Sequence, residues 1–140
     1  MKKFEYLSHT SEEKFAAYGK TMEEAFCNAA LALENIIVNT ENVKSVIKKK
    51  VCIETKHLKG LLFDFLQELL ILFDSEHIVI HKIADMHIQQ KGSDYVLECI
   101  VYGDNAKTYQ LLSGVKSVTY NEMEIIQENQ AWKITVVVDV

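Results

Sequence analysis

The stretch AWKITVVVDV, residues 131–140, decides the fold, because it has the composition of a β-strand from end to end. Its large apolar side chains alternate with other residues and share one face: Trp132, Ile134, Val136 and Val138. A run so rich in β-branched residues is typical of a central, well-covered strand. We therefore expect the rest of the chain to build a sheet around it. Asp139 lies at the end of this strand, where a carboxylate needs a partner.

Working outward from this strand, two amphipathic helices and about seven strands are predicted. Thr21 followed by Glu24 is a capping-box signal, and apolar spacing predicts a helix over residues 22–37. A second helix over residues 57–74 is apolar almost all round, except for a polar stripe. Strand patterns, mostly joined as hairpins, fall at residues 4–7, 15–18, 45–55, 78–90, 94–102, 115–120 and 123–127, besides 131–140.

The expected fold class is α+β. We predict one domain over residues 1–140, in which two amphipathic helices pack in a second layer on a largely antiparallel sheet. A chain of 140 residues buries enough surface to fold without disulfides or a structural metal. The strands do not alternate with helices as βαβ units, and no glycine-rich phosphate loop follows any strand.

Charge composition argues against direct binding to nucleic acid. The formal net charge is −5, and the chain has no arginine for bidentate phosphate contacts. The run Lys48-Lys49-Lys50 has two interpretations: a phosphate-facing patch, or a solvated, edge-protecting strand segment. The acidic balance of the whole chain favours the second interpretation.

The cysteines and the first residues indicate a cytoplasmic protein. Cys27, Cys52 and Cys99 are odd in number, widely spaced and set in apolar patterns, so we expect buried, reduced thiols. The first residues run directly into a strand pattern, and we expect neither a signal peptide nor a membrane-spanning segment.

Nucleophilic and transition-metal chemistry receive little support from the residues. Ser11, His9 and Asp139 have the atoms of a triad, but no nucleophile elbow is present. His77, His81 and His87 lack metal-ligand spacing. On the second helix, Asp64 and Glu68 are either an acid pair or part of a solvated stripe, and like charges at this spacing favour the solvated stripe.

The remaining possibility is that oxygen ligands bind a hard cation. Glu12 and Glu13 lie in a loop near the first strands, whereas Asp139 and Val140 end the last strand. If the first and last strands are neighbours, these oxygen donors meet. Carboxylates and main-chain oxygens without convergent His or Cys suit Ca²⁺ or Mg²⁺ rather than zinc.

Five segments of the sequence resemble the archease family, in order and across the whole chain. Residues 6–12 (YLSHTSE) resemble the hydrophobic-x-His-Thr-Ala-Asp motif of archeases, and residues 17–26 (AYGKTMEEAF) look like their strand-to-helix junction. Residues 61–70 (LLFDFLQELL) are similar to their second helix. Residues 115–120 (VKSVTY) and 136–140 (VVVDV) are similar to their Val-Lys strand and their terminal strand.

The resemblance implies a protein cofactor and not an enzyme. Archeases assist the GTP-dependent RNA ligase of tRNA splicing, the RtcB-type ligase, in the cytoplasm. They promote guanylylation of the ligase's active-site histidine and allow repeated turnover. The family is also linked to chaperone-like support of a tRNA methyltransferase, which implies a second partner.

The resemblance also implies a metal site at Glu12, Asp139 and Val140, with Lys116 needed for ligase activation. The chain departs from the family pattern at five positions: Glu12 replaces aspartate, Glu13 replaces an apolar residue, Lys14 replaces glycine, Gly114 replaces an acid, and Asn121 replaces histidine. The longer glutamate is better tolerated by the flexible shell of Ca²⁺ than by octahedral Mg²⁺, so Ca²⁺ is the expected ion. Lys14 is expected to compete with a metal for Glu12 or Asp139.

Two other functions compete with ligase activation. A metal-dependent enzyme would use Glu12 and Asp139 to hold an activated water, and it requires turnover by the isolated protein. A general chaperone or interaction module would use the apolar second helix or a strand edge, and it would keep its partners after Glu12 and Asp139 are removed.

Overall fold

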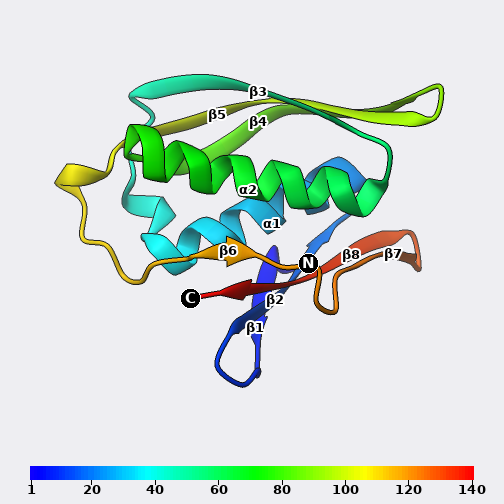
Figure 1. Ribbon diagram of the computed structural model, residues 1–140, viewed down its shortest axis with the longest axis horizontal. Coiled ribbons are helices and arrows are strands. Elements are labelled where there is room, and N and C mark those ends of the chain that lie inside the picture. The colour runs from blue at the N-terminus through cyan, green and yellow to red at the C-terminus, as the bar shows by residue number, and fades with distance from the viewer.

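The computed structural model describes all 140 residues and contains two helices and eight strands (Figure 1). The helices are α1 (Met22–Ile37) and α2 (Leu58–Glu76). The strands are β1 (Phe4–Leu7), β2 (Glu13–Gly19), β3 (Ile47–Thr55), β4 (Ile78–Lys91), β5 (Asp94–Asn105), β6 (Ser117–Val118), β7 (Glu124–Glu128) and β8 (Ala131–Asp139). Two short 3₁₀ turns lie at Thr40–Asn42 and Ala106–Thr108.

The strands form two antiparallel sheets. The larger sheet has the order β1-β2-β8-β6, and β7 also pairs with β8. The smaller sheet has the order β3-β5-β4. Strand β8 is therefore central in the larger sheet, as its composition predicts. Its apolar residues are covered on both faces, since Val136, Val137 and Val138 are all fully buried.

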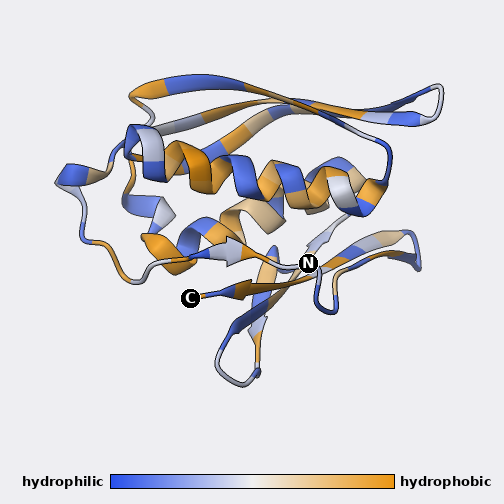
Figure 2. Cartoon of the chain, in the orientation of Figure 1, coloured by the Kyte–Doolittle hydropathy of each residue, from blue (hydrophilic) through white to orange (hydrophobic).

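The two helices lie between the sheets (Figure 1). Helix α1 contacts β2 and β8 of the larger sheet and β4 of the smaller one, and α2 contacts β3, β4, β5 and β6. Hydrophobic residues follow the helices and β8 (Figure 2), and they form one core cluster. Phe26 of α1 stacks on Phe65 of α2 with ring centroids 6.4 Å apart, at the centre of this core.

The predicted α+β class, with two helices packed on antiparallel sheets, is confirmed. The structure differs in that the strands divide between two sheets, so that both sheets share the same helical layer. The predicted strand at residues 115–120 shortens to Ser117–Val118. Residues 103–105, expected to form a turn, continue strand β5 instead.

Local signals set the ends of α1 as predicted, with one change. The Glu24 N–H donates to Thr21 Oγ1 at 3.1 Å, which is the first half of a capping box. The Glu24 side chain accepts instead from the Lys20 N–H, one residue before the cap. Gly19 is required at the junction, because a Cβ there would lie 2.4 Å from the backbone nitrogen of Ala25.

The expectation that all three cysteines are buried is wrong for Cys52. Cys99 is buried and Cys27 is partly buried, but Cys52 is exposed on β3. Strand alternation explains the difference, because Cys52 lies between Val51 and Ile53, which face the helices. All three thiols are free.

Candidate functional site

Asp139 lies at the end of β8, between β2 and β6. On the β6 side it is level with Ser117, whose hydroxyl donates to Asp139 Oδ2 at 3.2 Å. The backbone N–H of Lys116 donates to the Asp139 carbonyl oxygen at 2.8 Å. These contacts hold the strand end firmly, so that the carboxylate has a fixed position.

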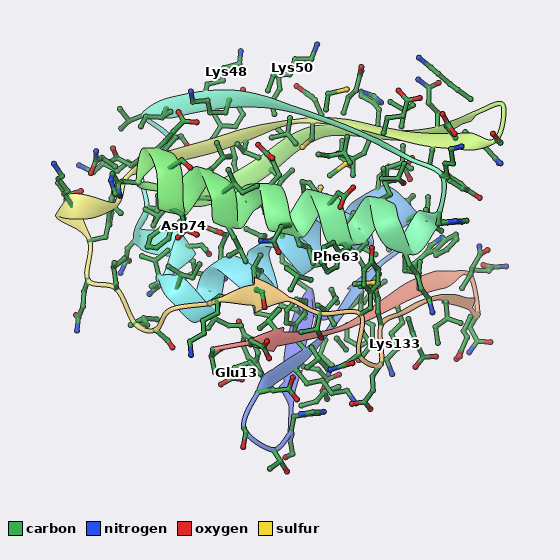
Figure 3. The ribbon with its side chains drawn as sticks, in the orientation of Figure 1. Glu13, Lys48, Lys50, Phe63, Asp74 and Lys133 are labelled. Carbon is green, nitrogen blue, oxygen red and sulfur yellow. The ribbon has the colours of Figure 1, made fainter.

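The β2 side of the same strand end carries the first predicted acids. Glu13 pairs with Val138, so Glu12, the next residue outward, follows at the level of Asp139. The neighbour of β8 on this side is thus β2, and the expectation that the first and last strands are neighbours is wrong, because β1 pairs with β2 and not with β8. Glu12 and Glu13 still lie by the end of β8, because they stand at the start of β2. Figure 3 shows Glu13 on this edge of the molecule.

Glu12 belongs to a charge network that sequence reasoning did not anticipate. Its Oε1 lies 3.3 Å from His9 Nδ1. The other ring nitrogen, His9 Nε2, lies 2.8 Å from Glu122 Oε2, and Lys14 Nζ lies 3.2 Å from Glu122 Oε1. We call His9, Glu12, Lys14 and Glu122 the strand-end network. Because Glu122 is 113 residues from His9 in sequence, no local pattern reveals the contact.

The strand-end network stabilises the negative charge of Glu122. The hydrogen bonds from His9 and Lys14 lower the pKa of Glu122 below its usual value. His9 Nδ1 is buried and, despite its closeness to Glu12, is not aligned for a hydrogen bond. Lys14 was expected to compete for Glu12 or Asp139, and this expectation is wrong, since it pairs with Glu122 instead.

Lys116 is exposed and forms no ion pair, because none of the five ion pairs in the structure includes it. Only its backbone is bonded to Asp139. Val140 is 40% exposed beside it. The structure therefore leaves the Lys116 ammonium group without an ion-pair partner, on a segment whose backbone is bonded to the end of β8.

The oxygen atoms at this strand end are of the type that binds a hard cation. Glu12 and Asp139 supply carboxylate oxygens, and Val140 supplies main-chain oxygen. No three side chains of His, Cys, Asp or Glu converge anywhere in the chain as a metal-binding group. A cation here would thus depend on main-chain oxygens as well as on the two acids, and Glu12 would have to turn from His9.

The other candidate groupings do not assemble. His9 contacts Glu122 and Glu12, and Asp139 accepts from Ser117, so no triad forms with Ser11. On α2, Asp64 is exposed and shares no hydrogen bond with Glu68, which agrees with a solvated stripe. The stripe nevertheless meets β6, because Gln67 Oε1 accepts from the Val118 N–H at 3.3 Å.

The fold and the strand end define a small α+β protein with oxygen donors gathered at the edge of a sheet. The sequence profile of the Archease protein family (MTH1598/TM1083) matches residues 4–140. This chain belongs to the archease family.

Relatives cover almost the full length of the chain. Protein archease of Methanosarcina acetivorans is 38% identical, over 99% of this chain and 97% of that protein. Protein archease of Pyrobaculum neutrophilum is 36% identical, over 98% and 95%. The family assignment thus rests on the whole domain and not on one motif.

Two solved structures share the fold. The solution structure of Methanobacterium thermoautotrophicum protein 1598 is 32% identical, with a TM-score of 0.86 over 100% of both chains. The crystal structure of a Thermotoga maritima archease, described as a possible chaperone, is 16% identical, with a TM-score of 0.55 over 96% of this chain and 94% of that one. At that identity the Thermotoga structure supports the fold alone. Neither helix here has the length and apolarity needed to cross a bilayer.

Proposed function

We propose that this chain is a protein cofactor of a GTP-dependent, RtcB-type RNA ligase in tRNA splicing and RNA repair. It promotes guanylylation of the ligase's active-site histidine and permits multiple turnover. It works in the cytoplasm, in keeping with three free cysteines, and is not itself the catalyst. The observation that carries the proposal is the strand end, where the exposed and unpaired Lys116 is anchored through its backbone N–H to the Asp139 carbonyl oxygen.

Lys116 has the chemistry that a nucleotidyl-transfer partner needs. A lysine ammonium is a point charge that attracts phosphate oxygens, and this one has no carboxylate to compete for it. Its backbone is anchored to β8, so its position is set by the sheet. Docked against the ligase, it would stabilise the charge of a bound GTP phosphate or of the transferring group.

A divalent cation, Ca²⁺, is part of the proposal. Glu12, Asp139 and Val140 would hold it, and its charge would set the electrostatics of the strand end beside Lys116. Ca²⁺ should raise the melting temperature of the wild type, because an ion that binds only the folded state stabilises it. Asp139→Asn should abolish the increase, whereas Asp94→Asn, in the β4–β5 hairpin, should keep it. An equal rise in Asp139→Asn would contradict the assignment.

The central experiment is a guanylylation assay with the cognate ligase and radiolabelled GTP. Wild-type protein should speed the labelling of the ligase, and Lys116→Ala and Asp139→Ala should lose the acceleration while melting like the wild type. Lys107→Ala, another exposed lysine, is the matched control and should remain active. Absence of any acceleration by the wild type would overturn the proposal.

A chaperone-like role for a tRNA methyltransferase is the second candidate. An exposed aromatic pair favours it: Tyr120, 55% exposed, stacks on Phe63 of α2 with centroids 4.3 Å apart. Such a pair beside a helix is a suitable anchor for a partner protein. Methyltransferase binding should then be weakened by Tyr120→Ala and kept in Asp139→Ala. Ligase activation, in contrast, should be lost in Asp139→Ala.

A further inference from the structure

The outer face of the smaller sheet carries three lysines without acidic partners. Lys48 and Lys50 are exposed and project from β3 away from the helices (Figure 3). The pairing register places both Lys48 and Lys82 level with Tyr102 of β5, which lies between them. Lys82 Nζ lies 4.9 Å from the centre of the Tyr102 ring. We call Lys48, Lys50, Lys82 and Tyr102 the lysine band.

The lysine run of β3 is divided by strand alternation. Lys49 has the opposite orientation, and it pairs with Glu76 at the end of α2 at 2.7 Å. None of the lysines of the band forms an ion pair. Acidic residues flank the band: Asp104 is two residues from Tyr102 on β5, and Glu98, level with Cys52 and His87, lines a hollow together with Lys50 and Asp85. None of these acids is within ion-pair distance of a lysine of the band, so its three ammonium groups are unpaired although the whole chain is acidic.

A hollow of about 390 Å³ adjoins the band at the edge of β4. Its walls include Lys3, Asn35, Thr40, His81 and Lys82, with Phe4 and Leu31 as the apolar part and Glu41 as the single acid. Lys82 belongs both to the hollow and to the band, so the two features are continuous. Two lysines and a histidine therefore line one hollow, together with one glutamate.

The wall of the hollow is held by hydrogen bonds, which leave one ring nitrogen available. Asn35 Nδ2 donates to Thr40 Oγ1 at 3.0 Å, and the Thr40 N–H donates to Asn35 Oδ1. His81 Nδ1 lies 2.8 Å from the Thr40 carbonyl oxygen, which only accepts, so Nδ1 carries the hydrogen. Nε2 is then free.

We propose that the lysine band and the adjoining hollow bind single-stranded RNA. One phosphate lies in the hollow between Lys3, His81 and Lys82, the next phosphates contact Lys48 and Lys50, and a base stacks on Tyr102. Single-stranded nucleic acids bind to surfaces that combine unpaired lysines with an aromatic ring, because phosphates bind the cations and bases stack on the ring. Tyr102 is partly exposed for this contact. The choice of RNA over DNA rests on the proposed role beside an RNA ligase. The location of the site rests on the charges alone.

Fluorescence anisotropy with a labelled single-stranded RNA of about 8 nucleotides tests the site on the isolated protein. Binding at low salt should have a Kd on the order of 10⁻⁵ M and weaken as salt rises. The triple variant Lys48→Ala/Lys50→Ala/Lys82→Ala should weaken binding at least ~10-fold and reduce the salt slope by about 2, since each lost phosphate contact removes about 0.7. The matched triple Lys20→Ala/Lys56→Ala/Lys133→Ala has the same net charge and should bind like the wild type.

Tyr102 tests the stacking contact separately. Tyr102→Phe should retain affinity, whereas Tyr102→Leu should weaken binding by at least ~5-fold, the lower end of the range for one stacked base. Equal losses in the two lysine triples, no binding by the wild type, or tighter binding of a poly-glutamate peptide than of the RNA would overturn the proposal. Equal affinity for DNA of the same sequence would overturn the choice of RNA. The anisotropy assay contains no ligase, so a negative result in it would not change the outcome of the guanylylation assay.

Discussion

At the scale of single residues, Glu34 is the most unusual side chain of the core. It lies on α1, is fully buried, and accepts the Ile80 N–H of β4 at 3.0 Å through Oε1. Its second oxygen, Oε2, has no partner. Burial raises the pKa of Glu34 to about 8, and the Ile80 hydrogen bond opposes the rise only in part. At neutral pH this carboxyl group is therefore largely protonated.

The raised pKa predicts that the protein loses stability as the pH rises. The folded state holds the Glu34 proton more tightly than the unfolded state, whose pKa is 4.5. The stability that comes from this proton is complete below pH 4.5 and is lost as the pH rises through about 8. By pH 7 the loss amounts to about 3 kcal/mol.

Glu34→Gln checks this prediction in urea unfolding measured from pH 5 to pH 8. The variant should lie within about 1 kcal/mol of the wild type at pH 5, and at pH 8 it should be more stable by about 4 kcal/mol, because the amide never ionises. The control is Glu41→Gln, which changes an exposed acid near the end of the same helix. Its free energy of unfolding should depend on pH as that of the wild type does. If the free energy of unfolding of Glu34→Gln falls with pH as steeply as that of the wild type, Glu34 is not the group that causes the pH dependence.

At the scale of elements, the β4–β5 hairpin depends on one glycine. Gly103 of β5 pairs with Ile80 of β4, next to a register shift between Ile80 and Lys82. A Cβ at Gly103 would lie 2.0 Å from the Val79 carbonyl oxygen, which is backbone and has little room to move. The two strands approach too closely here for any other residue.

Gly103→Ala should therefore lower the free energy of unfolding by at least ~2 kcal/mol, because the strands must separate to admit the methyl group. Gly114→Ala is the matched control, since a Cβ there meets nothing within 4 Å, and it should change stability by no more than about 0.5 kcal/mol. Chemical denaturation of both variants measures the difference. Similar unfolding midpoints for the two would contradict the close approach.

The cap of α1 gives a second prediction at this scale. Thr21 Oγ1 accepts the Glu24 N–H, and this bond satisfies one of the free donors of the first turn. Thr21→Ala should cost about 1 kcal/mol, whereas Thr21→Ser, which keeps the hydroxyl, should cost little. Thermal melts of the pair decide whether the hydroxyl or the methyl group of Thr21 matters.

At the scale of the whole molecule, α1 joins the two sheets into one folding unit. It packs on β2 and β8 from one sheet and on β4 from the other, and Leu33 is fully buried in this layer. Leu33→Ala should destabilise the protein by about 2–5 kcal/mol, since it removes apolar contacts and leaves a cavity.

Hydrogen exchange shows whether Leu33→Ala destabilises both sheets equally. The slowest amides of β8 and of β5, one from each sheet, should lose protection in Leu33→Ala by the same factor, because both open only when the helical layer separates. The exposed Ile71→Ala variant on α2 is the control and should leave both nearly unchanged. Loss of protection in one sheet alone would mean that the sheets unfold independently.

Local patterns in the sequence determined most of the elements. The spacing of apolar residues predicted α1 as residues 22–37, which are its bounds in the structure, and the β-branched run predicted that β8 is central. These features depend on neighbours one to four residues apart, so the sequence carries them directly. The closeness of Glu12 to Asp139 was predicted from the assumption that the first and last strands meet, whereas the structure brings the two together through β2; the pairing of Asp139 with β6 was not predicted.

The tertiary structure alone decided how the elements come together. The division into two sheets, the pairing of Glu122 with His9 and Lys14, and the placement of Lys82 beside Tyr102 join residues that are distant in sequence. The strand alternation that turns Lys49 toward Glu76 leaves Lys48 and Lys50 on the open face. Composition averages charge over the whole chain, whereas folding sorts it by face. A chain with a net charge of −5 can therefore still leave a row of unpaired lysines on one face.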